Sequence, residues 1–250
     1  MNPTRRRWLA FGPVLALLSV GSFLAGTRFV NSPPHPVHPL TGRVIGGIAT
    51  NVAWMDRIER ERDESPDRAL ALIGITAGMT VADIGAGSGY MTVRLARLVG
   101  PEGKVYANEL QPAMLQLIAA KVLEQHLANV ELVQGTEDDA RLPGNAVDLA
   151  LLVDVYHEFA HPQPMLRSIR RSLRPDGRLV LIEYRKEDPR IPIAVTHRLS
   201  LAEARTEIGA EGFGLDRVSE DLPRQHIIVF RRLLHSAPQA RSAPSTHSTR

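Results

Sequence analysis

Residues 81–90, VADIGAGSGY, constrain the fold of this chain more than any other segment. An apolar run that includes Asp83 is followed by Gly85, Gly87 and Gly89 at alternate positions. Glycine lets the backbone turn sharply and approach a ligand where a Cβ atom would collide, and the start of a following helix offers unpaired N–H groups. We therefore predict a strand, a ligand-binding turn and a helix in this segment.

Short β-like runs alternate with helical stretches between residues 51 and 234, which is typical of βαβ units around a parallel sheet. Strands are expected near 80–83, 104–108, 130–134, 147–153 and 178–183. Helices are expected near 52–62, 90–99, 112–126, 164–173 and 200–209, with another that opens at Ser65 and has Pro66 at its first position. Residues 215–219 and 225–231 should form an antiparallel hairpin. The fold class is thus α/β, a mainly parallel twisted sheet with helices on both faces.

The glycine segment does not fit the dinucleotide pattern GxGxxG, which would need glycine at Tyr90. It resembles motif I of class I S-adenosylmethionine-dependent methyltransferases, and the resemblance extends over residues 80–181, including the stretch LRPDGRLVL. It implies a Rossmann-like seven-stranded sheet that ends in an antiparallel hairpin, and S-adenosylmethionine as the cofactor. It also implies that Asp83 faces the cationic amino-acid end of the cofactor beside Gly85, Gly87 and Gly89.

Further acids follow the next two strands. Glu109 comes about twenty residues after the glycines, where a carboxylate can accept both ribose hydroxyls; an exposed helix-cap acid before Pro112 is the alternative. The family commonly places an acid on the adenine amino group after the third strand, where this chain has Glu137 and Asp138. Which of the two serves is left open, and a solvated acidic turn fits equally well.

Candidate groups for chemistry follow the fourth and fifth strands, because ligands of open parallel sheets bind beyond the carboxyl ends of the strands. We predict His157 as general base or acceptor-orienting group, since imidazole titrates near neutral pH; a structural histidine is the alternative. Glu183 and Arg185 could grip an acceptor or pair with one another. His197 and His226 could join them from later segments.

Residues 157–161, HEFAH, match the zinc-hydrolase pattern HExxH, which binds metal only when both histidines share a helix face. Pro162 and Pro164 disfavour a helix there, so no metal site is predicted. The expected activity is methyl transfer to a small-molecule acceptor. A noncatalytic module that senses S-adenosylmethionine is the rival hypothesis, and a zinc hydrolase is a less favoured one.

The N-terminal thirty residues combine three arginines at 5–7 with an uncharged stretch over 8–26, which indicates an export signal or a membrane anchor. TRRRWL also resembles a twin-arginine signal. We expect a membrane-anchored or exported protein, on the periplasmic side in a bacterium; cleavage and a cytoplasm-facing anchor are left open. We predict that residues 31–50 form a proline-rich tether that the fold does not need. Residues 51–234 should form the methyltransferase domain, and residues 235–250 a disordered tail.

The composition narrows the possible partners. Seven of the 30 basic residues lie before residue 51 or after residue 234, where there is no acid, so the folded part carries 23 basic and 27 acidic residues. A nucleic-acid-binding face is therefore not expected. The absence of cysteine excludes disulfides, thiolate metal sites and a cysteine nucleophile.

Overall fold

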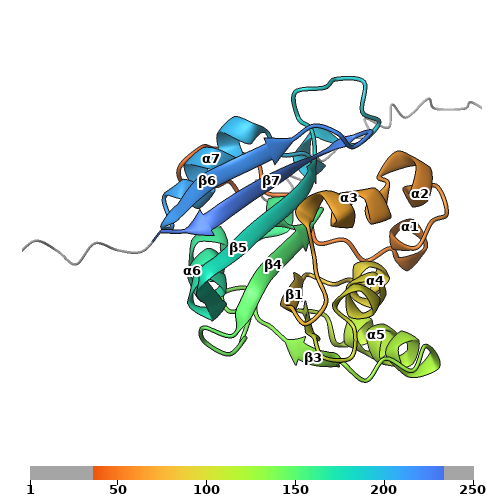
Figure 1. Cartoon of the computed structure of the whole chain (residues 1–250). Coiled ribbons are helices and arrows are strands. Elements are labelled where there is room, and N and C mark those ends of the chain that lie inside the picture. Colours follow the sequence, from red (N-terminus) through yellow and green to blue (C-terminus); the bar gives the residue numbers. More distant parts are fainter. Residues whose placement is uncertain (1–35, 234–250) are drawn as a thin grey trace, which may run out of the picture. The chain divides into compact units, whose positions relative to one another are not determined.

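A computed structural model describes residues 36–233, which form a seven-stranded sheet in the order β3-β2-β1-β4-β5-β7-β6 (Figure 1). The strands are β1 (Thr80–Ile84), β2 (Lys104–Glu109), β3 (Val130–Gln134), β4 (Val147–Val153), β5 (Leu173–Tyr184), β6 (Phe213–Ser219) and β7 (Gln225–Arg232). Strands β1 to β5 pair in parallel, and β7 pairs antiparallel with both β5 and β6. The predicted Rossmann-like sheet with a terminal antiparallel hairpin is confirmed.

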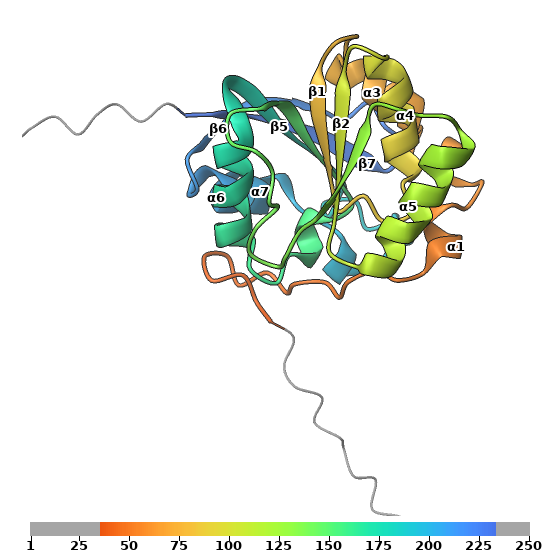
Figure 2. The same ribbon diagram turned by 90° about the horizontal axis from the view of Figure 1, so that it is seen from below.

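Both faces of the sheet are buried, as alternating side chains in the central strands show. In β4, Leu149 and Leu151 belong to one core cluster and Ala150 and Leu152 to the other, and all four are fully buried. The first cluster includes residues of α3 (Pro66–Ile73) and α4 (Tyr90–Val99), and the second includes residues of α6 (Pro162–Ser172) and α7 (Leu201–Gly209). Figure 2 shows the sheet between these helix layers, with α5 (Pro112–Glu124) beside α4.

The charged helix expected over residues 52–62 is divided into α1 (Val52–Met55) and α2 (Arg60–Asp63). The Arg60 guanidinium donates to the backbone carbonyl of Met55 at 2.7 Å and to the Glu64 carboxylate at 2.7 Å. These bonds stabilise the turn between the two helices. Local charge patterning predicted the helical residues but not the break, because the break depends on these specific contacts.

The structure contradicts the expectation that residues 36–50 are a tether without core positions. His38, Arg43 and Ile45 are buried, at 0%, 4% and 3% exposure. The Arg43 guanidinium pairs with the Glu207 carboxylate on α7, at 2.9 Å between Nη2 and Oε2. Because this segment supplies a buried charge to a partner on α7, the folded part starts before residue 51.

Two other predicted segments lie outside the described residues, namely the signal or anchor over residues 1–30 and the tail over 235–250. Within residues 36–233, no helix is both long enough and apolar enough to cross a membrane.

Candidate functional site

The predicted glycine turn follows β1 and leads into α4. Gly85, Gly87 and Gly89 all have positive φ, at 66°, 54° and 81°, a region that other residues rarely adopt. A Cβ on Gly85 would collide with the Val155 side chain, and one on Gly87 would lie 3.1 Å from the Met55 sulfur. Both backbone conformation and space therefore require glycine at this turn.

Glu109 lies at the end of β2 with its carboxylate against the glycine turn. Its Oε2 accepts from the Gly87 N–H at 2.9 Å, and its Oε1 accepts from the Gln111 N–H at 2.8 Å. The residue is 5% exposed, so it is not the exposed helix-cap acid considered from the sequence, although Gln111 does precede α5. A carboxylate oxygen has two lone pairs, so each oxygen can still accept a bond from a ligand.

Asp83 is buried in β1, at 2% exposure, and its Oδ2 accepts from the Thr92 hydroxyl at 2.6 Å. Burial raises its pKa to about 6, and the bond from Thr92 opposes that rise. A buried carboxylate of this kind is stabilised when a cation comes close to it. Asp83 lines the same cavity as the glycine turn and Glu109.

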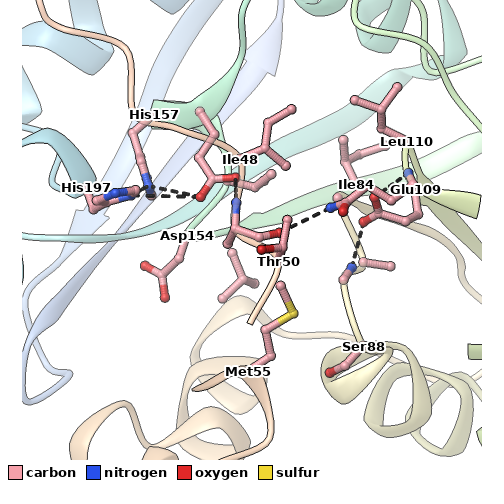
Figure 3. A pocket seen from close by; sticks show the side chains of 18 of the residues that line it. Ile48, Thr50, Met55, Ile84, Ser88, Glu109, Leu110, Asp154, His157 and His197 are labelled. Carbon is pink, nitrogen blue, oxygen red and sulfur yellow. Dashed lines mark hydrogen bonds and ion pairs between the residues drawn. The ribbon is translucent and has the colours of Figure 1, made fainter. Parts of the chain in front are cut away.

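A cavity of about 720 Å³ lies beyond the carboxyl ends of the central strands, a volume suited to a small-molecule ligand. Residues 47–51 line one side of it, and their register is fixed because Ala49 N–H donates to Glu158 and Ala49 C=O accepts from Gln111. In Figure 3, Glu109 lies towards one end of this pocket, and the imidazoles of His157 and His197 lie towards the other. We call the latter the imidazole end.

His157 is held from both sides at the imidazole end. Its Nδ1 lies 2.7 Å from Glu183 Oε2, and its Nε2 lies 3.0 Å from His197 Nδ1. Glu183 is fully buried, and its other oxygen accepts from the Tyr156 N–H at 2.8 Å. Burial lowers the pKa of His157, but the charge and hydrogen bond of Glu183 outweigh it, so the net shift is upward. Glu183 therefore positions the imidazole rather than reaching the cavity itself.

The neighbouring Glu158 completes this group, with its side chain only 10% exposed. Its Oε1 lies 3.7 Å from His157 Nε2 and 3.8 Å from His197 Nδ1. Burial, the largest effect, raises the pKa of Glu158 to about 7, while the His157 charge opposes the rise.

Asp154 follows β4 between the two ends of the cavity. It has a positive φ of 51°, and burial raises its pKa well above the usual range. Its Oδ2 accepts from the Gln225 amide at 2.7 Å, whereas Oδ1 is buried without a hydrogen-bond partner within the described residues. Strained backbone and an unsatisfied buried oxygen are features that concentrate at ligand sites.

The other candidates are placed less centrally. Glu137 lines the cavity with a half-exposed side chain, whereas Asp138 is outside the lining, and both face His161 at 3.5 and 3.8 Å. Arg185 does not line the cavity. Its guanidinium donates to the carbonyls of residues 222, 223 and 225, so it secures the loop before β7 and pairs with Glu220, not with Glu183. This placement does not support the predicted acceptor-binding role of Arg185.

His226 is 1% exposed and bonds to the backbone carbonyl of Leu199 at 3.0 Å, so it does not reach the cavity either. The HExxH geometry is not formed: His157 lies in a short 3₁₀ turn, η1 (Tyr156–Glu158), and His161 precedes α6 with a 55% exposed side chain. His197, from the 3₁₀ turn η2 (Val195–His197), joins His157 instead.

Several cavity residues come from segments to which the sequence assigned no function. These are residues 47–51 together with Trp54, Met55, Arg57, Arg60 and Glu64. The only sequence signal was the dense charge of RIERERDE at 57–64, which is also typical of a solvated helix.

The glycine turn, the buried acid of β1 and the carboxylate of β2 lie together at the switch point of a Rossmann-like sheet, which is where such sheets bind nucleotide-type cofactors. Residues 75–220 match the family described as "Methyltransferase domain". The chain belongs to this family of S-adenosylmethionine-dependent methyltransferases, which confirms the predicted family and cofactor.

Individual relatives agree with this family. The chain is 35% identical over 114 residues to a ubiquinone/menaquinone biosynthesis C-methyltransferase of Hahella chejuensis, covering 45% of this chain and 46% of the relative. The chain thus spans about half the length of the curated relatives it matches. A solved methyltransferase from Aquifex aeolicus is 29% identical with a TM-score of 0.67, covering 71% of this chain and 94% of that one. The [4+2]-cyclase SpnF, 17% identical with a TM-score of 0.58 over 81% of this chain and 90% of its own, shows the fold alone.

Proposed function

We propose that the protein transfers a methyl group from S-adenosylmethionine to a small-molecule acceptor bound at the imidazole end of the cavity. The carboxylate of Glu109, held against the Gly87 N–H beside a cavity of about 720 Å³, is the observation that carries this proposal. When bound, S-adenosylmethionine supplies an electrophilic methyl group on a sulfonium. Alignment of the acceptor is then the main task of the protein.

The described residues suit the donor. Asp83 offers a buried negative charge to the cationic amino-acid end, and the glycine turn permits close approach of the backbone. Glu109 keeps lone pairs for two ribose hydroxyls. Of the two acids after β3, Glu137 is the better candidate for the adenine end, because it lines the cavity and Asp138 does not.

His157 orients the acceptor or takes its proton. When its Nδ1–H donates to Glu183, the Nε2 atom is left as an acceptor directed towards His197 and the cavity. Such a group suits an acceptor with an ionisable hydroxyl, because loss of that proton makes the oxygen, or a ring carbon conjugated to it, nucleophilic. The curated relatives bear the name of a C-methyltransferase, which agrees with the second possibility. The acidic balance of the folded part and a cavity of about 720 Å³ favour a small molecule over a nucleic acid.

Glu109→Ala tests the cofactor half of this proposal. Loss of charged hydrogen bonds to two hydroxyls should weaken S-adenosylmethionine binding by about 1.5–3 kcal/mol, roughly tenfold to a hundredfold in Kd. The change also removes the acceptor of the Gly87 and Gln111 amides, so isothermal titration calorimetry must be paired with circular dichroism. Glu131→Ala, which removes the same charge from a half-exposed position on β3, is the matched control and should bind like the wild type.

Turnover is measured separately, by screening hydroxylated aromatic and aliphatic acceptors with methyl-labelled cofactor. A folded Glu109→Ala protein with wild-type affinity would show that the donor does not bind here. Binding without transfer to any acceptor would favour the noncatalytic sensor over the enzyme.

A further inference from the structure

We propose that His157, Glu158 and His197 bind a divalent transition-metal ion, best fitted by zinc, whose open coordination position takes an oxygen of the acceptor. The three side chains come from the 3₁₀ turns η1 and η2, which lie next to one another and line the cavity. The metal site stands on its own geometry, and only the role assigned to the ion rests on the proposed methyl transfer.

The separations of the donor atoms match one shared ion. His157 Nε2 and His197 Nδ1 are 3.0 Å apart, and Glu158 Oε1 lies 3.7 and 3.8 Å from them. An ion equidistant from three atoms with these separations lies about 2.1 Å from each, within the range of about 2.0–2.2 Å for zinc bonds to histidine nitrogen and carboxylate oxygen.

Neighbouring groups fix two of the three donors, as they do in built metal sites. The buried Glu183 carboxylate lies 2.7 Å from His157 Nδ1, which leaves the Nε2 lone pair for an ion, the arrangement of carboxylate–histidine–metal triads. The Ala49 N–H donates to Glu158 Oε2 at 3.1 Å and leaves Oε1 for the ion. Each ligand except His197 thus has a hydrogen bond that sets its orientation.

Gly46 closes one side of the group. A Cβ on this residue would lie 3.0 Å from His157 Cδ2 and 3.3 Å from His197 Nδ1, so a larger residue would push against both imidazoles. The His197 side chain is 38% exposed and lines the cavity, which leaves space on the other side. Because Gly46 covers one side of the three ligands and the cavity lies on the other, an ion here would have three protein ligands and one open coordination position towards the cavity. That is the pattern of catalytic rather than structural zinc.

The donor types select the ion. Two imidazole nitrogens and one carboxylate suit zinc and similar first-row divalent ions, and they disfavour calcium and magnesium, which take oxygen ligands. With bonds of about 2.1 Å, neighbouring ligand atoms lie about 3.0 Å apart in an octahedral site and about 3.4 Å apart in a tetrahedral one. The nitrogen–oxygen separations of 3.7 and 3.8 Å are closer to the tetrahedral value, which suits zinc. An ion here would lower the pKa of an acceptor hydroxyl that coordinates it, with the released proton passing to solvent. His157 then orients the acceptor through the ion.

The test is zinc binding by untagged protein, freed of metal with a chelator and then titrated with zinc by calorimetry. Metal content after dialysis is read by mass spectrometry, and cobalt substitution gives the absorption spectrum of the site. We expect one equivalent of zinc in the wild type. His197→Ala and Glu158→Gln should each weaken zinc binding by about tenfold to a hundredfold. Glu158→Gln keeps an oxygen for the Ala49 N–H, so it remains informative if His197→Ala misfolds.

His161→Ala is the matched control, because His161 is exposed and completes the HExxH pattern without belonging to the group. It should bind zinc like the wild type. Two results would overturn the proposal: wild-type protein without stoichiometric zinc, or zinc lost in His161→Ala but kept in His197→Ala. Labelled-methyl transfer by zinc-free protein would refute the role of the ion and leave the methyltransferase proposal standing. Zinc binding without transfer to any acceptor would leave the metal site standing and contradict both the methyltransferase proposal and the role of the ion.

Discussion

Replacing Arg43 by alanine should destabilise the whole domain, although this arginine lies in a segment rich in proline and glycine. Its side chain is 2% exposed and that of Glu207 is fully buried. The guanidinium bonds to both carboxylate oxygens, with Nε 3.1 Å from Oε1 and Nη2 2.9 Å from Oε2, and Nη1 bonds to the His157 carbonyl at 3.1 Å. Removing one partner of a buried pair leaves the other charge uncompensated, which costs about 3–5 kcal/mol.

The lower part of that range applies, because Glu207 keeps two other contacts. The Thr41 hydroxyl donates to it, and His38 Nε2 lies 3.6 Å away. For a domain of this size we expect a loss of about 3 kcal/mol, or a fall in Tm of about 6–12 °C, by thermal and urea unfolding. Replacing both partners, as Arg43→Met with Glu207→Leu, should restore most of the stability, since a buried pair contributes little net free energy.

The matched control is Arg171→Ala, which breaks the exposed contact of Arg171 with Asp139 at 3.4 Å. Exposed pairs contribute about 0–1 kcal/mol, so its unfolding should stay close to that of the wild type. The reasoning is refuted if Arg43→Ala unfolds within about 1 kcal/mol of the wild type, or if the double replacement is less stable than the single one.

Two further predictions concern cofactor binding and the domain boundary. Because burial raises the pKa of Asp83 to about 6, its charge is lost as pH falls, so calorimetry between pH 7 and 5 should show S-adenosylmethionine affinity falling by up to about tenfold per unit below pH 6. Asp83→Asn should bind more weakly at pH 7 and lose this dependence, and an unchanged slope would contradict the role of Asp83. A protein that begins at residue 36 should be as stable as the full chain and bind the cofactor as tightly. One that begins at residue 51 loses the Arg43–Glu207 pair and part of the cavity lining, so it should be less stable and bind the cofactor more weakly. Equal stability of the two truncated proteins would restore the tether interpretation.

The strands were predictable from the sequence because their burial pattern is local. The apolar run at residues 147–153 predicts a strand buried on both faces, as the structure has it. The glycine turn, Asp83 and Glu109 indicated a cofactor site because one βαβ unit fixes the spacing between them. The strand β5 starts at Leu173 rather than 178, since Leu173 already pairs with Val147 of β4, before a shift in register that no local pattern indicates.

The sequence named His157 and His197 as separate candidates, but it did not predict that their side chains meet, because the two residues are far apart in the chain. His157 and His197 meet only when η1 and η2 pack together, which no local pattern indicates. The sequence did indicate, from Pro162 and Pro164, that His161 does not share a helix with His157, and the structure agrees. The buried role of Arg43 was equally hidden, since its partner Glu207 lies 164 residues away.

Residues 36–50 connect the two halves of the cavity, and this gives the segment a role beyond stability. The Gly46 N–H donates to the His157 carbonyl at 2.9 Å, and Ala49 bonds to Glu158 on one side and to Gln111 on the other. Gln111 in turn donates to Glu109, the residue assigned to the ribose. The groups that we propose hold the donor and those that we propose face the acceptor are therefore joined through one short stretch of backbone. Displacing that stretch should weaken both sites together, whereas a change at His197 should affect the acceptor end alone.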